Sequence, residues 1–179
     1  MTTFYATFES PVGPLLLMSD GTSLTGLHTE NDKHRPVIRS DWVRDDSVAP
    51  FAQTVAQLQA YFDGGLTEFG LPLAPKGTEF QMTVWRELCN IPFGETISYA
   101  ELARRIGRPT ASRAVGHSNA RNPISIIVPC HRVIGADNSL TGYAGGLDRK
   151  RALLEHEARI RERETRPSAT LQGQLAFGM

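Results

Sequence analysis

The chain has 179 residues, and its 19 basic and 19 acidic side chains give a formal net charge of zero, which taken alone argues against nucleic acid as a partner. This length predicts one domain or two small ones, and no apolar run approaches the ~20 residues of a membrane-spanning helix. The two cysteines are too few for a disulfide framework and the first residues lack a signal-peptide pattern, so we expect a cytoplasmic protein.

Short apolar and aromatic runs predict three strands near the N-terminus. The second and third flank Asp20-Gly21, a sequence typical of hairpin turns. Residues 29–47 are polar and irregular, and no cysteine is available there to join His28 and His34 as zinc ligands. We interpret both histidines as surface or loop residues. The predicted strands are Phe4–Glu9, Leu15–Ser19 and Leu24–His28.

Two amphipathic helices are predicted on either side of a linker. Val48–Phe62 carries apolar residues at the 3.6-residue period of a helix, and Gly64-Gly65 ends it. Leu71–Thr78 contains two prolines and a glycine and is the best linker candidate. Glu79–Cys89 forms the second helix, in which we expect Cys89 to be a small core residue.

The neutral total hides an uneven distribution of charge. Residues 1–79 carry five basic and ten acidic side chains, a balance of −5. Residues 80–179 carry 14 basic and nine acidic side chains, a balance of +5. This asymmetry suggests a cationic working surface on the C-terminal part, although an unevenly solvated surface would look the same.

The next segment predicts a helix-turn-helix. Ser98-Tyr-Ala-Glu101 has the form of a capping box and opens a helix that ends at Gly107-Arg-Pro109. Thr110 is placed to cap a second helix over Ala111–Ala120, which is rich in small residues. Its single long cation, Arg113, lies in the first turn. The pattern is typical of DNA-binding helix pairs, but tightly packed helical hairpins share it.

The strongest candidates for catalytic residues follow the apolar run Ile124–Val128. This run predicts a buried strand that ends at Pro129 and Cys130. His131 and Arg132 come directly after this cysteine. A neighbouring base or cation lowers the pKa of a thiol and makes it nucleophilic. His131 would then need a group that orients it, and Glu157 in a predicted helix is a candidate.

Several motifs in this order and spacing resemble those of the O6-alkylguanine-DNA alkyltransferases, the methylated-DNA–protein-cysteine methyltransferases. The resemblance is dense from Thr78 to about Arg159 and looser before it. The motifs are Ser10-Pro-x-Gly-Pro14, Tyr61-Phe62-x-Gly64, Phe80-Gln-x-x-Val-Trp85, Ile91-Pro-Phe-Gly-Glu95, Ser98-Tyr99, Arg113-Ala-Val-Gly116, Asn122-Pro, Pro129-Cys-His-Arg-Val133, Gly142-Tyr-x-Gly-Gly146 and His156-Glu157.

This resemblance implies an α+β fold. A ribonuclease-H-like α/β domain would occupy residues 1–77, and a mainly helical alkyltransferase and DNA-binding domain with the helix-turn-helix would occupy 78–165, followed by a tail at 166–179. The implied partner is double-stranded DNA containing alkylated guanine or thymine. We expect a monomer that needs no cofactor, metal or membrane.

The resemblance also implies catalytic roles. Cys130 would accept the alkyl group, irreversibly and once per molecule, because nothing in the sequence is suited to cleave the thioether product. His131, acting through a water and paired with Glu157, would help form the thiolate. Asn122 would hold the turn around the active site.

Further roles concern the DNA, from which the family extrudes the damaged base through the minor groove. The implied DNA contacts are Tyr99, Arg113, Ala114 and Arg132. The implied walls of the base pocket are Tyr99, Val133, Tyr143 and Ala144. Arg113 would fill the space left by the flipped base, whose extrusion costs a few kcal/mol.

Two other function classes fit part of the pattern. Cys130 and His131 would also suit a cysteine peptidase or amidase, which turns over and needs an oxyanion hole. Alternatively, the chain is a DNA-binding module with an inert cysteine. Addition of a single methyl group to Cys130 discriminates all three.

Overall fold

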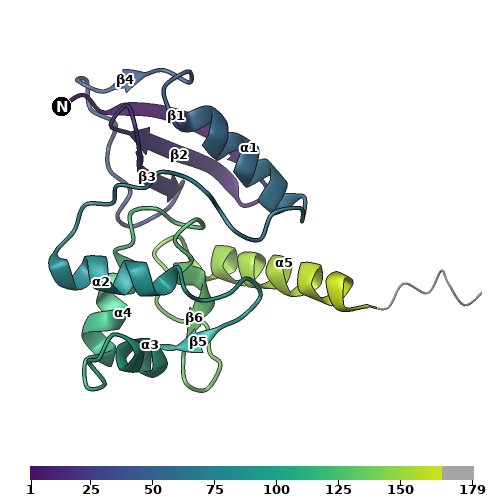
Figure 1. Ribbon diagram of the computed structural model, residues 1–179. Helices are drawn as coiled ribbons and strands as arrows, with labels where there is room; N and C mark the ends of the chain where they lie inside the picture. Colours follow the sequence, from purple (N-terminus) through teal and green to yellow (C-terminus); the bar gives the residue numbers. More distant parts are fainter. Residues whose placement is uncertain (167–179) are drawn as a thin grey trace, which may run out of the picture.

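The computed structural model describes residues 1–166 and places a sheet layer above a mainly helical half (Figure 1). The N-terminal half comprises β1 (Phe4–Ser10), β2 (Gly13–Ser19), β3 (Leu24–Thr29), β4 (Val43–Arg44) and α1 (Phe51–Phe62). The C-terminal half comprises α2 (Glu79–Leu88), β5 (Ile97–Ser98), α3 (Tyr99–Arg105), α4 (Ser112–Ala120), the 3-10 helix η1 (Cys130–Arg132), β6 (Val133–Ile134) and α5 (Leu147–Thr165). This is the expected α+β architecture.

The sheet has the order β3-β2-β1-β4 and confirms the three predicted strands. In the turn between β2 and β3, Asp20 Oδ1 accepts hydrogen bonds from the Thr22 and Ser23 amides at 2.9 and 2.8 Å. Gly21 has a φ of +103°, which L side chains rarely adopt. Strand β4 was not predicted, because its two exposed residues carry no alternation and it depends on parallel pairing with β1.

Helix α1 crosses one face of the sheet (Figure 1) and begins at Phe51, three residues later than predicted. Pro50 restricts the residue before it to extended conformations, so the helix starts only after the proline. Phe51, Leu58 and Tyr61 are buried, as the 3.6-residue period requires. Val48 still packs against the core from outside the helix.

The predicted linker is an ordered connection that extends the edge of the sheet. The Leu24 amide donates to Pro72 O, and the Ala74 amide donates to Leu24 O, both at 2.8 Å. Thr78 then starts α2 through a complete capping box with Gln81. The boundary between residues 77 and 78 stays a prediction, and the predicted tail lies outside the described residues apart from Arg166.

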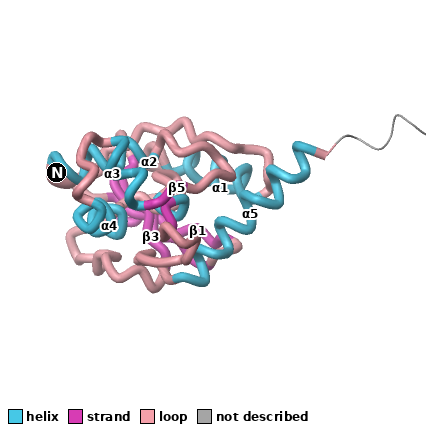
Figure 2. The backbone as a smooth tube through the Cα atoms, turned by 90° about the horizontal axis from the view of Figure 1, so that it is seen from below, coloured by secondary structure: helices cyan, strands magenta, loops and turns pink. Residues whose placement is uncertain are grey.

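Strand β3 also contacts the C-terminal half. The Leu27 amide donates to Pro123 O at 2.9 Å, and the Ser125 amide donates to Leu27 O at 3.0 Å. Seen from below, the strands lie among the helices while α5 projects at one end (Figure 2). The two halves therefore share backbone hydrogen bonds as well as a core.

Helices α3 and α4 form the expected helix pair and pack against each other. Ser98 Oγ accepts the Glu101 amide, but the Glu101 carboxylate binds arginines of its own helix and leaves the capping box incomplete. Ala111, not Thr110, is the N-cap of α4, so the predicted cap is wrong by one residue.

Among the described residues, no helix has both the length and the apolarity to cross a membrane.

Candidate active site

Cys130 begins η1 and is only 4% exposed. The predicted strand at Ile124–Val128 is wrong, because these buried residues form successive turns in which Ile126 has a φ of +72°. Asn122 causes this geometry. Its Nδ2 donates to Val128 O at 2.7 Å while its Oδ1 accepts the Ile124 amide at 3.0 Å, so one side chain closes the turn that carries the cysteine.

The cysteine is also joined to helix α4. Asn119 Nδ2, near the end of this helix, donates to Cys130 O at 3.3 Å. In the preceding residue, Ser118 O accepts a hydrogen bond from the Trp85 indole of α2 at 2.8 Å. The predicted DNA-binding helix and the candidate nucleophile therefore belong to one packed unit.

His131 is fully buried and its Nε2 contacts the Glu157 carboxylate directly. This contact fixes the orientation of the ring and directs its Nε2 proton to the carboxylate. The other ring nitrogen, Nδ1, has no partner among residues 1–166. In the neutral ring, Nδ1 is thus a buried proton acceptor.

Glu157 stays ionised in this network. Burial alone would raise its pKa, but His131 and Arg132 outweigh it and lower the pKa to about 2. Two further donors support the charge: the Tyr61 hydroxyl binds Oε2 at 3.1 Å, and the Gly94 amide binds Oε1 at 3.2 Å. The buried carboxylate can therefore stabilise a proton arriving on His131.

Arg132 was predicted to contact DNA, and that prediction is wrong. Its Nε donates to Glu157 Oε1 at 2.7 Å and its Nη1 donates to Ile91 O at 2.7 Å. The residue is 6% exposed, so its guanidinium is committed to the interior and is not available to phosphates. Sequence could not reveal this, because both partners lie at least 25 residues away.

The thiol itself is protonated in the free protein. Burial raises the pKa of Cys130 to about 11, against the opposing effects of Asn122 and the positive charge of Lys150. A protonated thiol is a poor nucleophile, so reaction requires that a base remove the proton. His131, the residue after Cys130, offers such a base in its buried Nδ1, which has no partner among residues 1–166.

Lys150 is a functional candidate that the sequence reasoning missed. It is fully buried, and its Nζ donates to Val133 O at 2.5 Å and to Thr141 O at 2.7 Å. Burial lowers its pKa to about 8. Helical periodicity could have placed it inside, since it shares the buried face of α5 with Leu153 and Glu157.

The predicted pocket residues lie around these carbonyls. The Tyr99 hydroxyl donates to Thr141 O at 2.8 Å, and Val133 is fully buried. Tyr143 is 7% exposed, and its hydroxyl has no partner in the described part of the chain. Ala144 O accepts the Lys33 amide at 3.2 Å, which connects the N-terminal half to these predicted pocket residues.

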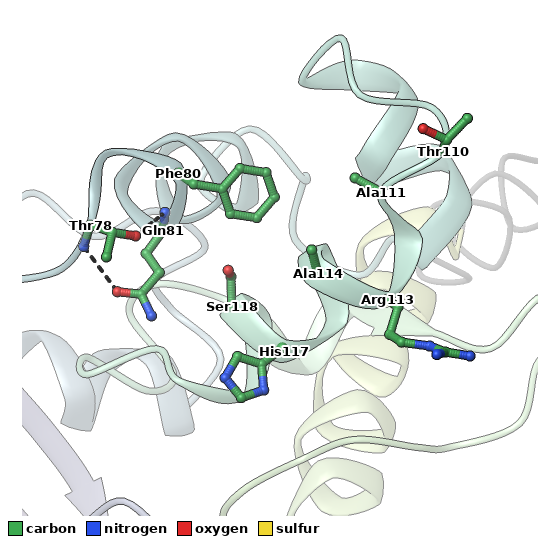
Figure 3. Close-up of a pocket in the computed structure, with 9 residues that line it drawn as sticks. All are labelled: Thr78, Phe80, Gln81, Thr110, Ala111, Arg113, Ala114, His117 and Ser118. Carbon is green, nitrogen blue, oxygen red and sulfur yellow. Dashed lines mark hydrogen bonds between the residues drawn. The ribbon is translucent and has the colours of Figure 1, made fainter.

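A groove of about 670 Å³ runs between the start of α2 and the outer face of α4. Figure 3 shows Phe80 on one side, Ala114 and Ser118 on the other, and Arg113 extending away from them. Arg113, Ala114 and His117 are exposed and share one face of α4. This face can approach a polyanion closely, because it combines cationic and small side chains.

His28 differs from its predicted surface position. It is 5% exposed, and its Nδ1 lies 3.3 Å from Asp32 Oδ2 in a buried pair. His34 is exposed as predicted.

Cys89 is exposed too, so its assignment to the core is wrong: α2 ends at Leu88 and Cys89 is its C-cap. Within residues 1–166, no three metal-binding side chains gather as ligands.

Comparisons with known proteins identify the family to which this chain is similar. The profile of the family described as "6-O-methylguanine DNA methyltransferase, ribonuclease-like domain" matches residues 3–75, and that described as "6-O-methylguanine DNA methyltransferase, DNA binding domain" matches residues 79–159. A curated relative from Methanosarcina acetivorans, named methylated-DNA–protein-cysteine methyltransferase, is 52% identical over 86% of this chain and 97% of its own length. The Mycobacterium tuberculosis protein of that name is 54% identical over 86% of this chain and 91% of its own length.

Solved structures show the same similarity. The M. tuberculosis O6-methylguanine methyltransferase superposes with a TM-score of 0.82 at 50% identity, covering 93% of this chain and 96% of that one. M. tuberculosis OGT in complex with DNA gives a TM-score of 0.81 at 52% identity, covering 88% of this chain and 94% of that one.

Proposed function

This chain belongs to the 6-O-methylguanine DNA methyltransferase family and is a DNA-repair methyltransferase, and we propose that Cys130 is its alkyl acceptor. The substrate is O6-alkylguanine in duplex DNA. One observation carries the assignment: a buried thiol is followed directly by a histidine whose one ring nitrogen is bound by an ionised carboxylate and whose other nitrogen is free. Such a histidine can accept a proton on its free Nδ1, and the carboxylate bound to Nε2 stabilises the charge that results.

The reaction is a displacement at the alkyl carbon. The thiol proton passes through a water to His131 Nδ1, and Glu157 stabilises the imidazolium. Cys130 Sγ then forms a bond to the alkyl carbon as the bond from that carbon to guanine O6 breaks. The electron pair stays on the guanine, which takes up one proton from the Tyr99 hydroxyl. The proton held by His131 then returns through water to Tyr99, so the net proton gained by the guanine is the one lost by the thiol. The thioether is stable in water, so each molecule acts once.

The remaining assigned residues shape the site. Asn122 keeps the turn closed, and Val133, Tyr143 and Ala144 line the pocket for the extruded base. Because Cys130 is only 4% exposed, the base must leave the helical stack to reach it. Lys150 joins two edges of that pocket through its carbonyl contacts.

DNA binding is proposed for the outer face of α4. Arg113 and Ala114 are exposed there, and the related M. tuberculosis OGT was crystallised in complex with DNA. Arg113 would occupy the space left by the flipped base, and Ala114 would allow close approach to the minor groove. O4-alkylthymine presents the same alkyl–oxygen bond and is proposed as a further substrate. We expect the protein to act as a monomer.

The test is the intact mass of the protein after mixing with duplex DNA containing O6-methylguanine. We expect one methyl group per molecule, located on the Cys130 peptide, and no further repair afterwards. Cys130→Ser should bind the same DNA without gaining mass. Multiple turnover, a methyl group on another residue, or binding by the wild type without any mass change would contradict the proposal, and the last result would favour a lesion-binding module.

A further inference from the structure

The turn that follows β3 is closed by a buried contact between the side chains of His28 and Asp32. Asp32 uses both carboxylate oxygens: Oδ2 lies 3.3 Å from His28 Nδ1, and Oδ1 accepts the His34 amide at 2.7 Å. His28 and Asp32 are 5% and 8% exposed. Although burial alone would raise the pKa of Asp32, the hydrogen bonds from His28 and the His34 amide lower it, so the carboxylate is ionised. The pair therefore fixes residues 28–34 as a rigid unit.

This turn contacts the wall of the proposed base pocket. The Lys33 amide donates to Ala144 O at 3.2 Å. The adjacent Gly145 O accepts Arg149 Nη1 at 3.0 Å, and Arg149 Nε donates to Val12 O at 3.0 Å. Two segments of the N-terminal half thus hold the chain at Ala144 and Gly145, directly after Tyr143.

The packing at this point leaves no free space. A Cβ atom placed on Gly145 would lie 2.8 Å from Thr29 Oγ1 and 3.0 Å from Tyr143 Cε1. Thr29 is 1% exposed, and its hydroxyl has no partner within the described part of the chain. A shift of the turn after β3 would therefore move Gly145 and the ring of Tyr143 with it.

We propose that His28 and Asp32 are positioning residues for alkyl transfer, because they fix the turn whose Lys33 amide holds the Tyr143–Ala144 wall of the base pocket relative to Cys130. This inference rests on the proposed function, which assigns that wall to the pocket. Neither residue touches the reacting atoms; they act through Lys33 and Ala144.

Charge and position make opposite predictions for Asp32, which allows a sharp test. The negative charge of Asp32 raises the pKa of the Cys130 thiol. If its charge were its main effect, Asp32→Asn would ease thiolate formation and speed the transfer. If its main effect is to hold the pocket wall, the same variant slows the transfer.

The experiment measures the first-order rate of methyl transfer at saturating O6-methylguanine duplex, together with the DNA concentration giving half the maximal rate. We expect Asp32→Asn to lower the maximal rate about tenfold or more, since misplacing a positioned group by about 1 Å can cost about 100-fold. The half-saturating concentration should stay within about twofold of wild type, because the exposed face of α4 is untouched. Glu30→Gln is the matched control, removing one exposed charge from the same turn.

Two His28 variants separate positioning from a general loss of stability. His28→Gln retains a donor for Asp32 and should restore most of the rate, whereas His28→Leu should resemble Asp32→Asn at a temperature where both are folded. Faster amide exchange at Lys33 in Asp32→Asn should accompany the slower transfer. An Asp32→Asn rate within twofold of wild type, or above it, refutes this inference alone. A wild type that gains no methyl group refutes the proposed function on which it rests.

Discussion

Replacing Glu157 by Gln removes the negative charge that lies between His131 and Arg132 in the interior. The pKa of this carboxyl is lowered from 4.5 to about 2, which corresponds to about 3 kcal/mol of stability at neutral pH. A second route gives a similar value, since removing one partner of a buried ion pair typically costs about 3–5 kcal/mol. We therefore expect the melting temperature of the Glu157→Gln protein to fall by about 6–12 °C for a chain of this size.

The pH dependence of this effect has a definite sign. The folded pKa of Glu157 lies below its unfolded value, so the stabilisation is complete above about pH 4.5 and is lost as the pH falls towards about 2. The difference in unfolding free energy between wild type and Glu157→Gln should therefore shrink over that interval. At neutral pH it should be at its largest.

Thermal unfolding followed by circular dichroism measures the stability, and the methyl-transfer assay at a temperature where both proteins are folded measures the chemistry. We expect the transfer rate to fall about 100-fold or more, because the base loses the group that orients and stabilises it. Glu155→Gln, an exposed position on the same helix, is the control and should change neither quantity. A Glu157→Gln protein that melts within 2 °C of wild type would refute the reasoning.

Three further predictions follow from the same site. Asn122→Ala removes the two side-chain hydrogen bonds that close the turn before Cys130, and it should lower the unfolding free energy by about 2 kcal/mol or more in urea titrations. An unchanged urea midpoint would contradict this role of Asn122. Because the pKa of Cys130 is raised to about 11, its alkylation by iodoacetamide in the free protein should accelerate up to about that pH, and a plateau below pH 8 in peptide mass spectra would show a different thiol environment. Arg113→Ala should weaken duplex binding in fluorescence anisotropy while leaving transfer from the free modified base intact, and equal loss of both would place Arg113 in the catalytic machinery instead.

Local sequence rules predicted the elements whose causes are local. Asp20-Gly21 forms its turn from bonds within three residues, and the Thr78 hydroxyl caps α2 by accepting the amide of Gln81, three positions away. The run Ile124–Val128 shows the limit of such rules. Apolar residues predicted its burial correctly, but its conformation depends on the side chain of Asn122, so turns replaced the strand.

The direction of charged side chains depends on partners that are distant in sequence. Arg132 follows the candidate nucleophile and looked like a DNA contact, yet Glu157 and Ile91 O turn it inward. Lys150 was not singled out from the sequence, and its partners, Val133 O and Thr141 O, lie 17 and nine residues away. Cys130 and His131 were grouped by their adjacency, and Glu157 was one candidate to orient the histidine; the resemblance to known proteins then singled it out, and the structure brings His131 and Glu157 into contact.

The outer edge of β3 has a consequence for dividing or recombining this chain. β3 is the last strand of its sheet, and an open strand edge is a template for pairing with other molecules. Here Leu24 and Leu27 are covered by backbone from the connection at Pro72 and the turn at Pro123. The N-terminal half produced alone would lose the cover at Leu27 and become prone to aggregation. Chimaeras between relatives should therefore keep β3 and the Asn122–Val128 turn from the same parent.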